Sequence, residues 1–86
     1  MHERKMEALG ILQEEAAEVI KEVSKVRRSG EHFYPFNGPR SNWDNLQDEV
    51  YDFLILAREA GLSLDVPEDY EREKYAKLHK WSTLFK

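Results

Sequence analysis

Two pairs of acidic residues, each pair three positions apart, are the part of this sequence best suited to chemistry. Glu15 and Glu18 form the first pair, and Glu49 and Asp52 form the second. Residues three apart are neighbours on a helix surface, so each pair would hold two carboxylates side by side. Like charges at this spacing repel each other, and more strongly where water is excluded. A hard divalent cation would offset that repulsion, and Mg²⁺ or Mn²⁺ suits a site built only from oxygen ligands.

A solvated acidic face is the alternative interpretation of the same residues. Glutamate is a strong helix former, and most acidic stripes on helices simply face water. That interpretation would be preferred for a single pair. The second pair stands in the same register as the first relative to nearby apolar residues, so the pattern alone leaves both interpretations open.

Three helices are expected to position these acids. The first is predicted over residues 3–28, which contain no proline and in which apolar residues recur every three or four positions. The second is predicted to begin near Ser41 or Asn42, both good N-cap residues, and the third at Asp65 and Pro67. The apolar seams consist of Leu9, Leu12, Ala16, Val19, Val23 and Val26 on the first helix and of Leu46, Val50, Phe53, Ala57 and Ala60 on the second.

The acids line the same side of both seams. Each of the four stands one position before a seam residue, namely Ala16, Val19, Val50 or Phe53. No histidine follows any of these acids by three residues, which disfavours the Glu-x-x-His ligand set of di-iron helical bundles. The pattern therefore favours a non-redox cation if a metal is bound.

Length, charge and composition restrict the function classes. The 86 residues are expected to form a single domain, 1–86. The net charge of -4 argues against broad nucleic-acid binding, which needs a basic face. The absence of cysteine excludes disulfides, thiolate metal sites and cysteine catalysis. No apolar run is long enough to span a membrane and the charged N-terminus is not a secretory signal, so we expect a cytoplasmic protein without a membrane partner.

The two acidic motifs and their surroundings resemble those of the MazG-like nucleotide pyrophosphohydrolases, which belong to the all-α NTP pyrophosphatase superfamily. The matching segments are QEEAAEV, with Glu15-x-x-Glu18, and NLQDEVYDFLIL, with Glu49-x-x-Asp52. SKVRRSG is similar to the end of the family's first helix, and the resemblance covers most of the chain. Two features depart from the family pattern. The thirty residues between the motifs are slightly more than usual, and Tyr51 occupies a place that is often glycine.

The resemblance implies an activity and a ligand set. Members hydrolyse the bond between the α- and β-phosphates of a nucleoside triphosphate, which yields the monophosphate and pyrophosphate. Carried over to this sequence, Glu15, Glu18, Glu49 and Asp52 would bind Mg²⁺, with Mn²⁺ as an alternative. The substrate would be a ribo- or deoxynucleoside triphosphate, and the role would be control of the nucleotide pool.

Two further acids and one lysine of the first helix are candidates for the same site. A spare carboxylate, Glu14 or Glu22, would serve as general base, and the sequence does not choose between them. Lys25 would either contact a phosphate or complement the helix dipole near the end of this helix.

Three candidates lie outside the first helix. Lys74 and Lys77 would contact the β- and γ-phosphates, although solvated lysines are commoner. Trp43 would stack on a base, although an aromatic residue beside a loop more often anchors that loop in the core.

The expected architecture is all-α: a long antiparallel helical hairpin plus a C-terminal helix, with a four-helix bundle completed by oligomerisation. A homodimer or homotetramer is expected because a lone core in so short a chain would be marginal. One rival function is a non-enzymatic interaction module, an antitoxin- or adaptor-like dimer whose acids only confer solubility. A phosphoribosyl-ATP or dUTP hydrolase on the same scaffold is a second, enzymatic rival.

Overall fold

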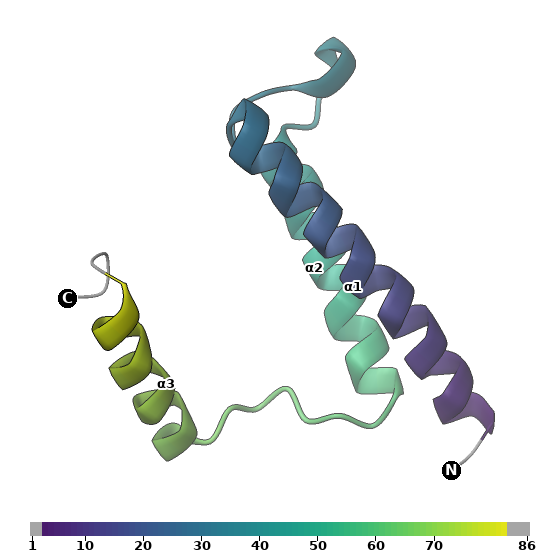
Figure 1. Ribbon diagram of the computed structural model, residues 1–86. Coiled ribbons are helices and arrows are strands. Elements are labelled where there is room, and N and C mark those ends of the chain that lie inside the picture. Colours follow the sequence, from purple (N-terminus) through teal and green to yellow (C-terminus); the bar gives the residue numbers. More distant parts are fainter. Residues whose placement is uncertain (1–2, 83–86) are drawn as a thin grey trace.

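The structure is a computed structural model that describes residues 3–82, and all of its regular elements are helical (Figure 1). They are α1 (Glu3–Ser29), the short 3₁₀ turn η1 (Pro35–Asn37), α2 (Asn42–Glu59) and α3 (Glu68–Trp81). The predicted all-α class is confirmed for these residues. None of the three helices is long and apolar enough to cross a membrane.

Local hydrogen bonds explain where α2 begins and ends. The Ser41 hydroxyl accepts a hydrogen bond from the Asp44 backbone N–H at 3.1 Å, and the Asp44 carboxylate accepts one from the Ser41 backbone N–H at 3.0 Å. This capping box satisfies two backbone donors, and the bond from the Ser41 backbone lowers the pKa of Asp44. At the other end Gly61 has a φ of +88°, which only glycine adopts at no steric cost, and the Leu62 N–H bonds to the Ala57 carbonyl at 3.0 Å.

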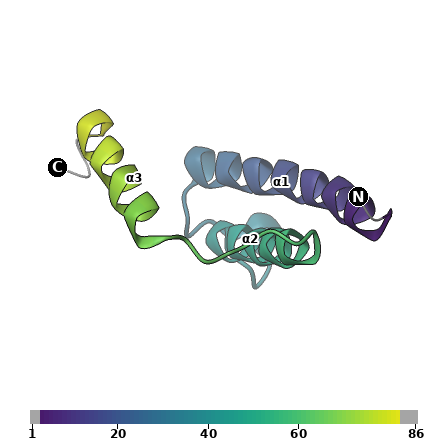
Figure 2. The ribbon, with the colours of Figure 1, turned by 90° about the horizontal axis from the view of Figure 1, so that it is seen from below.

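α1 and α2 lie side by side and run in opposite directions (Figure 1 and Figure 2). At one end of the pair Asn42, only 1% exposed, donates from its amide to the carbonyls of Lys25 and Gly30 at 3.4 and 3.2 Å. At the other end Arg4 donates to Glu59 at 3.0 Å. The Arg4–Glu59 pair is exposed and contributes little, so Asn42 is the stronger tie between the helices.

Very little apolar surface is buried within the described residues. The buried apolar residues are all alanines: Ala8, Ala57 and Ala60. The accessible surface is 7298 Å², about 2000 Å² more than the roughly 5300 Å² expected for a compact monomer of this mass. Large apolar side chains remain exposed on all three helices, among them Ile20, Tyr51, Ile55, Tyr70 and Trp81.

α3 stands apart from the other two helices (Figure 1). None of its residues is buried, and α1 with α2 is the only extensively packed pair of helices in the described part of the chain. The radius of gyration is 16.1 Å, compared with about 12 Å for a compact domain of this length. A helix of 14 residues without packing is marginal in water, so α3 needs a surface to cover its apolar side chains.

Replacing Asn42 by Ala is expected to lower the free energy of unfolding by about 1–3 kcal/mol, because two carbonyls at the end of α1 lose a buried donor. Asn42→Asp keeps the shape of the side chain but sets an acceptor against those carbonyls, so it should cost at least as much. Urea unfolding followed by circular dichroism, at equal protein concentrations, measures the difference.

The matched control for this prediction is Gln47→Ala, on an exposed position of α2. It should change the free energy of unfolding by no more than about 0.5 kcal/mol. If Asn42→Ala were as stable as this control, the side chain of Asn42 would not stabilise the contact between α1 and α2.

Candidate metal centre

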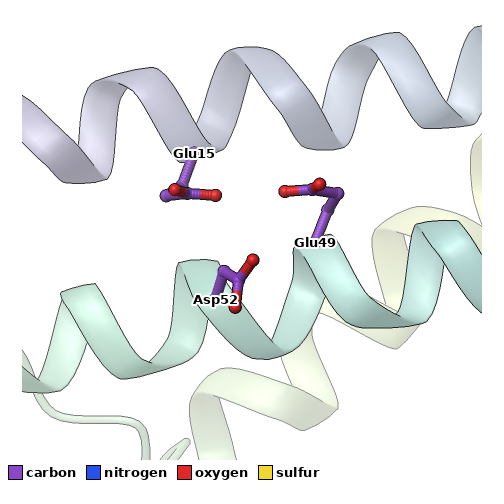
Figure 3. A group of neighbouring side chains, drawn as sticks. All are labelled: Glu15, Glu49 and Asp52. Carbon is purple, nitrogen blue, oxygen red and sulfur yellow. The ribbon is translucent and has the colours of Figure 1, made fainter.

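Three carboxylates from two helices converge beside the contact between α1 and α2 (Figure 3). Glu15 comes from α1, Glu49 and Asp52 come from α2, and each offers an oxygen within 4.8 Å of the others. Glu15 and Glu49 are half-buried, whereas Asp52 is exposed. A Mg²⁺ ion with oxygens about 2.1 Å away separates its ligands by about 3–4 Å, so small side-chain rotations would bring this group to binding geometry.

The register of α1 and α2 determines which side the acids occupy. Glu15 and Glu49 each stand one position before a seam residue, and one position turns a helix by about 100°. An open apolar groove of about 270 Å³ is lined by Ala16, Val19, Ile20, Val50 and Phe53. The α1–α2 pair therefore has an acidic side and an apolar side, and the same helical contact fixes both.

The pKa of Glu49 is raised above its ordinary value. Partial burial is the largest cause, followed by the hydrogen bond with Glu15 and by the negative charges of Glu15, Asp52 and Glu18. Glu18 is not one of the three converging carboxylates, but its charge acts on Glu49. Three of the four predicted ligands thus meet directly, and the fourth lies within their electrostatic reach.

The two predicted general bases lie in different surroundings. Glu22 is buried, its Oε1 accepts from Lys25 Nζ at 3.1 Å, and its Oε2 has no hydrogen-bond partner among the described residues. A carboxylate held in this way suits the positioning of Lys25 better than proton exchange with water. Glu14 is exposed and lines an open hollow with Glu7 and Gln13. Neither belongs to the converging group.

The predicted substrate-binding residues are spread over all three helices. The Lys25 side chain is 35% exposed beside Glu22, and Trp43 is 52% exposed in the first turn of α2. Lys74 and Lys77 lie on α3, where they line a small hollow with Tyr70 and Trp81. A single chain therefore does not bring the α3 lysines to the carboxylates, which lie on α1 and α2.

No family model, curated protein or solved structure matches this chain. The geometry and charge of the described residues are therefore the observations that bear on what the site does. The convergence of Glu15, Glu49 and Asp52 from different helices carries the most weight, because a purely solvated stripe does not require it.

The metal-free Glu49→Gln variant is expected to melt about 2–4 °C above the unsubstituted protein near pH 8, because the amide relieves like-charge repulsion of about 0.5 kcal/mol. The sign follows from the raised pKa of Glu49. Below the ordinary value of 4.5, Glu49 is protonated in both folded and unfolded chains and carries no penalty. Stability is lost as the pH rises through the folded value, so the advantage of the variant should vanish near or below pH 4.

Thermal melts with a chelator across this pH range measure that difference. The control is Glu7→Gln, on an exposed position of α1, which should raise the melting temperature near pH 8 by less than Glu49→Gln does. A Glu49→Gln variant less stable than the unsubstituted protein at neutral pH would contradict the inferred repulsion.

Proposed function

We propose that this chain is a Mg²⁺-dependent nucleoside triphosphate pyrophosphohydrolase that cuts between the α- and β-phosphates. The observation that carries the proposal is the convergence of Glu15, Glu49 and Asp52, with Glu18 beside them, at the positions of two MazG-like motifs. An all-carboxylate set fits a hard cation, Mg²⁺ or alternatively Mn²⁺. The raised pKa of Glu49 supports the proposal, since a cation would relieve the crowding that causes part of it.

A divalent cation would supply what an acidic site lacks toward a triphosphate. When bound, it would neutralise phosphate charge and lower the pKa of an attacking water. The carboxylates of α1 and α2 would fix its position, so catalysis would depend mainly on orientation and electrostatics. Water would add to phosphorus and pyrophosphate would leave, giving the nucleoside monophosphate.

Other residues of α1 and α2 have roles in this proposal that follow from their surroundings. Glu22 would hold Lys25 in position, and Lys25 would contact a phosphate. Glu14, which is exposed, is the better candidate for the general base. Trp43, half exposed at the start of α2, would stack on the base of the nucleotide.

The proposal includes an oligomer, a homodimer or a homotetramer. Two antiparallel α1–α2 hairpins would pair through their apolar grooves into a four-helix bundle. The surplus of about 2000 Å² of accessible surface in each chain amounts to about 4000 Å² for two chains, which is within the range that obligate dimers bury. Because the acids lie on the other side of each hairpin, this pairing would leave the metal centre open to a substrate.

A non-enzymatic interaction module is the second candidate, and the large exposed apolar surface favours it. An antitoxin- or adaptor-like dimer would bury the same side chains and would use the acids only for solubility. Such a module gains nothing from half-buried carboxylates that repel each other at a cost in stability. Metal binding and turnover separate the two candidates.

Mg²⁺ or Mn²⁺ is expected to raise the melting temperature of the chelator-stripped protein. Binding to the folded state alone adds about 2.7 kcal/mol at a hundredfold excess over Kd, which corresponds to about 10 °C or more for a domain of this size. Glu49→Gln should lose most of this shift and Glu7→Gln should retain it, with KCl of equal ionic strength as the control for screening. The absence of any shift at millimolar metal would favour the interaction module.

Glu18→Gln and Glu49→Gln are each expected to reduce nucleotide hydrolysis by about 100-fold or more, because glutamine keeps the shape but not the charge that holds the cation. A panel of nucleotides that includes dUTP and phosphoribosyl-ATP is incubated with Mg²⁺, and chromatography separates monophosphate plus pyrophosphate from diphosphate plus phosphate. Glu7→Gln should retain full turnover. If Glu18→Gln and Glu49→Gln also retained full turnover, the proposed assignment as a nucleoside triphosphate pyrophosphohydrolase would be wrong.

A further inference from the structure

α2 is apolar on two opposite sides. Phe53 lines the groove beside α1, whereas Tyr51, Leu54 and Ile55 are 56%, 36% and 50% exposed. At about 100° per residue, Ile55 lies about 200° from Phe53 around the helix. An apolar stripe on a helix normally faces another part of the protein or a partner. We call Tyr51, Leu54 and Ile55 the outer stripe of α2, and within the described residues this stripe stays exposed.

α3 has an apolar face that is largely exposed, with only Leu78 half-buried. Tyr70, Leu78 and Trp81 recur at helical spacing, and Val66, just before the helix, extends the same side. Val66, Tyr70 and Leu78 together line an open hollow of about 520 Å³. We call these four residues the apolar face of α3. One chain therefore presents two exposed apolar helical surfaces that a single contact would cover.

The connection from α2 directs α3 away from the α2 of its own chain. The Leu62 N–H bonds to the Ala57 carbonyl at 3.0 Å, and the Asp65 N–H bonds to the Ser63 hydroxyl at 3.2 Å. Residues 62–67 form no helix. α3 therefore begins at a distance from the α1–α2 pair (Figure 1). Six extended residues reach about 20 Å, which is enough to place α3 on a neighbouring chain.

Charges of both signs lie in and around the two surfaces. Lys74 lies within the apolar face of α3, one turn from both Tyr70 and Leu78, and Lys77 stands next to Leu78. Asp52, three residues before Ile55, borders the outer stripe of α2. Arg58, three residues after Ile55, borders the same stripe, so docking would allow Lys74 to pair with Asp52 and Glu71 to pair with Arg58 across the contact.

We propose that α3 docks on the outer stripe of α2 in a second copy of this chain, and that the exchange is mutual. Exchange of an identical element is a low-cost route to a dimer. The surplus of accessible surface, about 4000 Å² for two chains, is enough for this interface of standard size beside the pairing of the grooves. The docking itself does not depend on hydrolysis. One consequence rests on the proposed function: Lys74 and Lys77 would border the partner's Asp52 and so supply the phosphate-binding lysines that one chain does not bring to its own carboxylates.

Cross-linking between introduced cysteines tests the exchange, since the full chain contains no cysteine. Ile55→Cys chains are mixed with Leu78→Cys chains and treated with a short bismaleimide, with each variant alone as the reference. A covalent dimer of the mixed chains is expected. Arg72→Cys, on the opposite side of α3, replaces Leu78→Cys in the control and should lose the link.

A chain that carries both Ile55→Cys and Leu78→Cys separates exchange from docking within one chain. Exchange predicts linked dimers in denaturing electrophoresis. Internally linked monomers, or no link at all, would overturn the proposal. Adding Glu49→Gln keeps this test distinct from the proposed function, because the cross-link should persist when the metal centre is lost.

A variant of α3 gives a second measurement on the full chain. Leu78→Asp is expected to weaken self-association by about tenfold or more in sedimentation, since it places a charge in the contact. Arg72→Asp introduces the same aspartate on the opposite side of α3 and should leave the association unchanged. An unchanged oligomer in Leu78→Asp would overturn the exchange.

Discussion

Repulsion among carboxylates that the helix contact holds together is the constraint on which the rest of the structure depends. Glu15 and Glu49 stand one position before the seam residues Ala16 and Val50, so packing the seam carries the acids toward one another. Side-chain rotations change the distances between them, but the register of α1 and α2 keeps them on the same side of the helix pair. The raised pKa of Glu49 reflects this crowding. A bound cation would offset the repulsion, and the same carboxylates would be its ligands.

The shortage of buried apolar surface is the second constraint, and it acts on the opposite side of the same helices. Three alanines are the only buried apolar residues described, which is too little for a chain that must offset the entropy of ordering its backbone. The apolar groove, the outer stripe of α2 and the apolar face of α3 all require partners. Association would therefore complete the core, while the acidic side stays free for chemistry.

Periodicity made the helices and the shared side of the acids predictable, because both depend on local geometry. Ser41 as N-cap and Gly61 as the end of α2 also follow from local rules. Sequence patterns do not give the distances between side chains on different helices, so the pattern could not show that Glu18 stays outside the converging group. The i,i+3 spacing of Glu22 and Lys25 was a usable signal for their ion pair, but the burial of Glu22 depends on tertiary packing, which the spacing does not give. The separation of α3 from α1 and α2 was not predictable, because the sequence of an apolar face does not identify the surface that it contacts.

Direct counting of bound Mn²⁺ by electron paramagnetic resonance tests the central claim most directly, because only the free ion gives the sharp six-line spectrum. Titration of the chelator-stripped protein should show Mn²⁺ withdrawn from solution in fixed proportion to chains, displaceable by Mg²⁺. The Glu49→Gln variant should withdraw far less, and Glu7→Gln as much as the unsubstituted chain. Equal binding by the Glu49→Gln variant, or no binding by the unsubstituted protein, would contradict a metal centre at Glu15, Glu49 and Asp52.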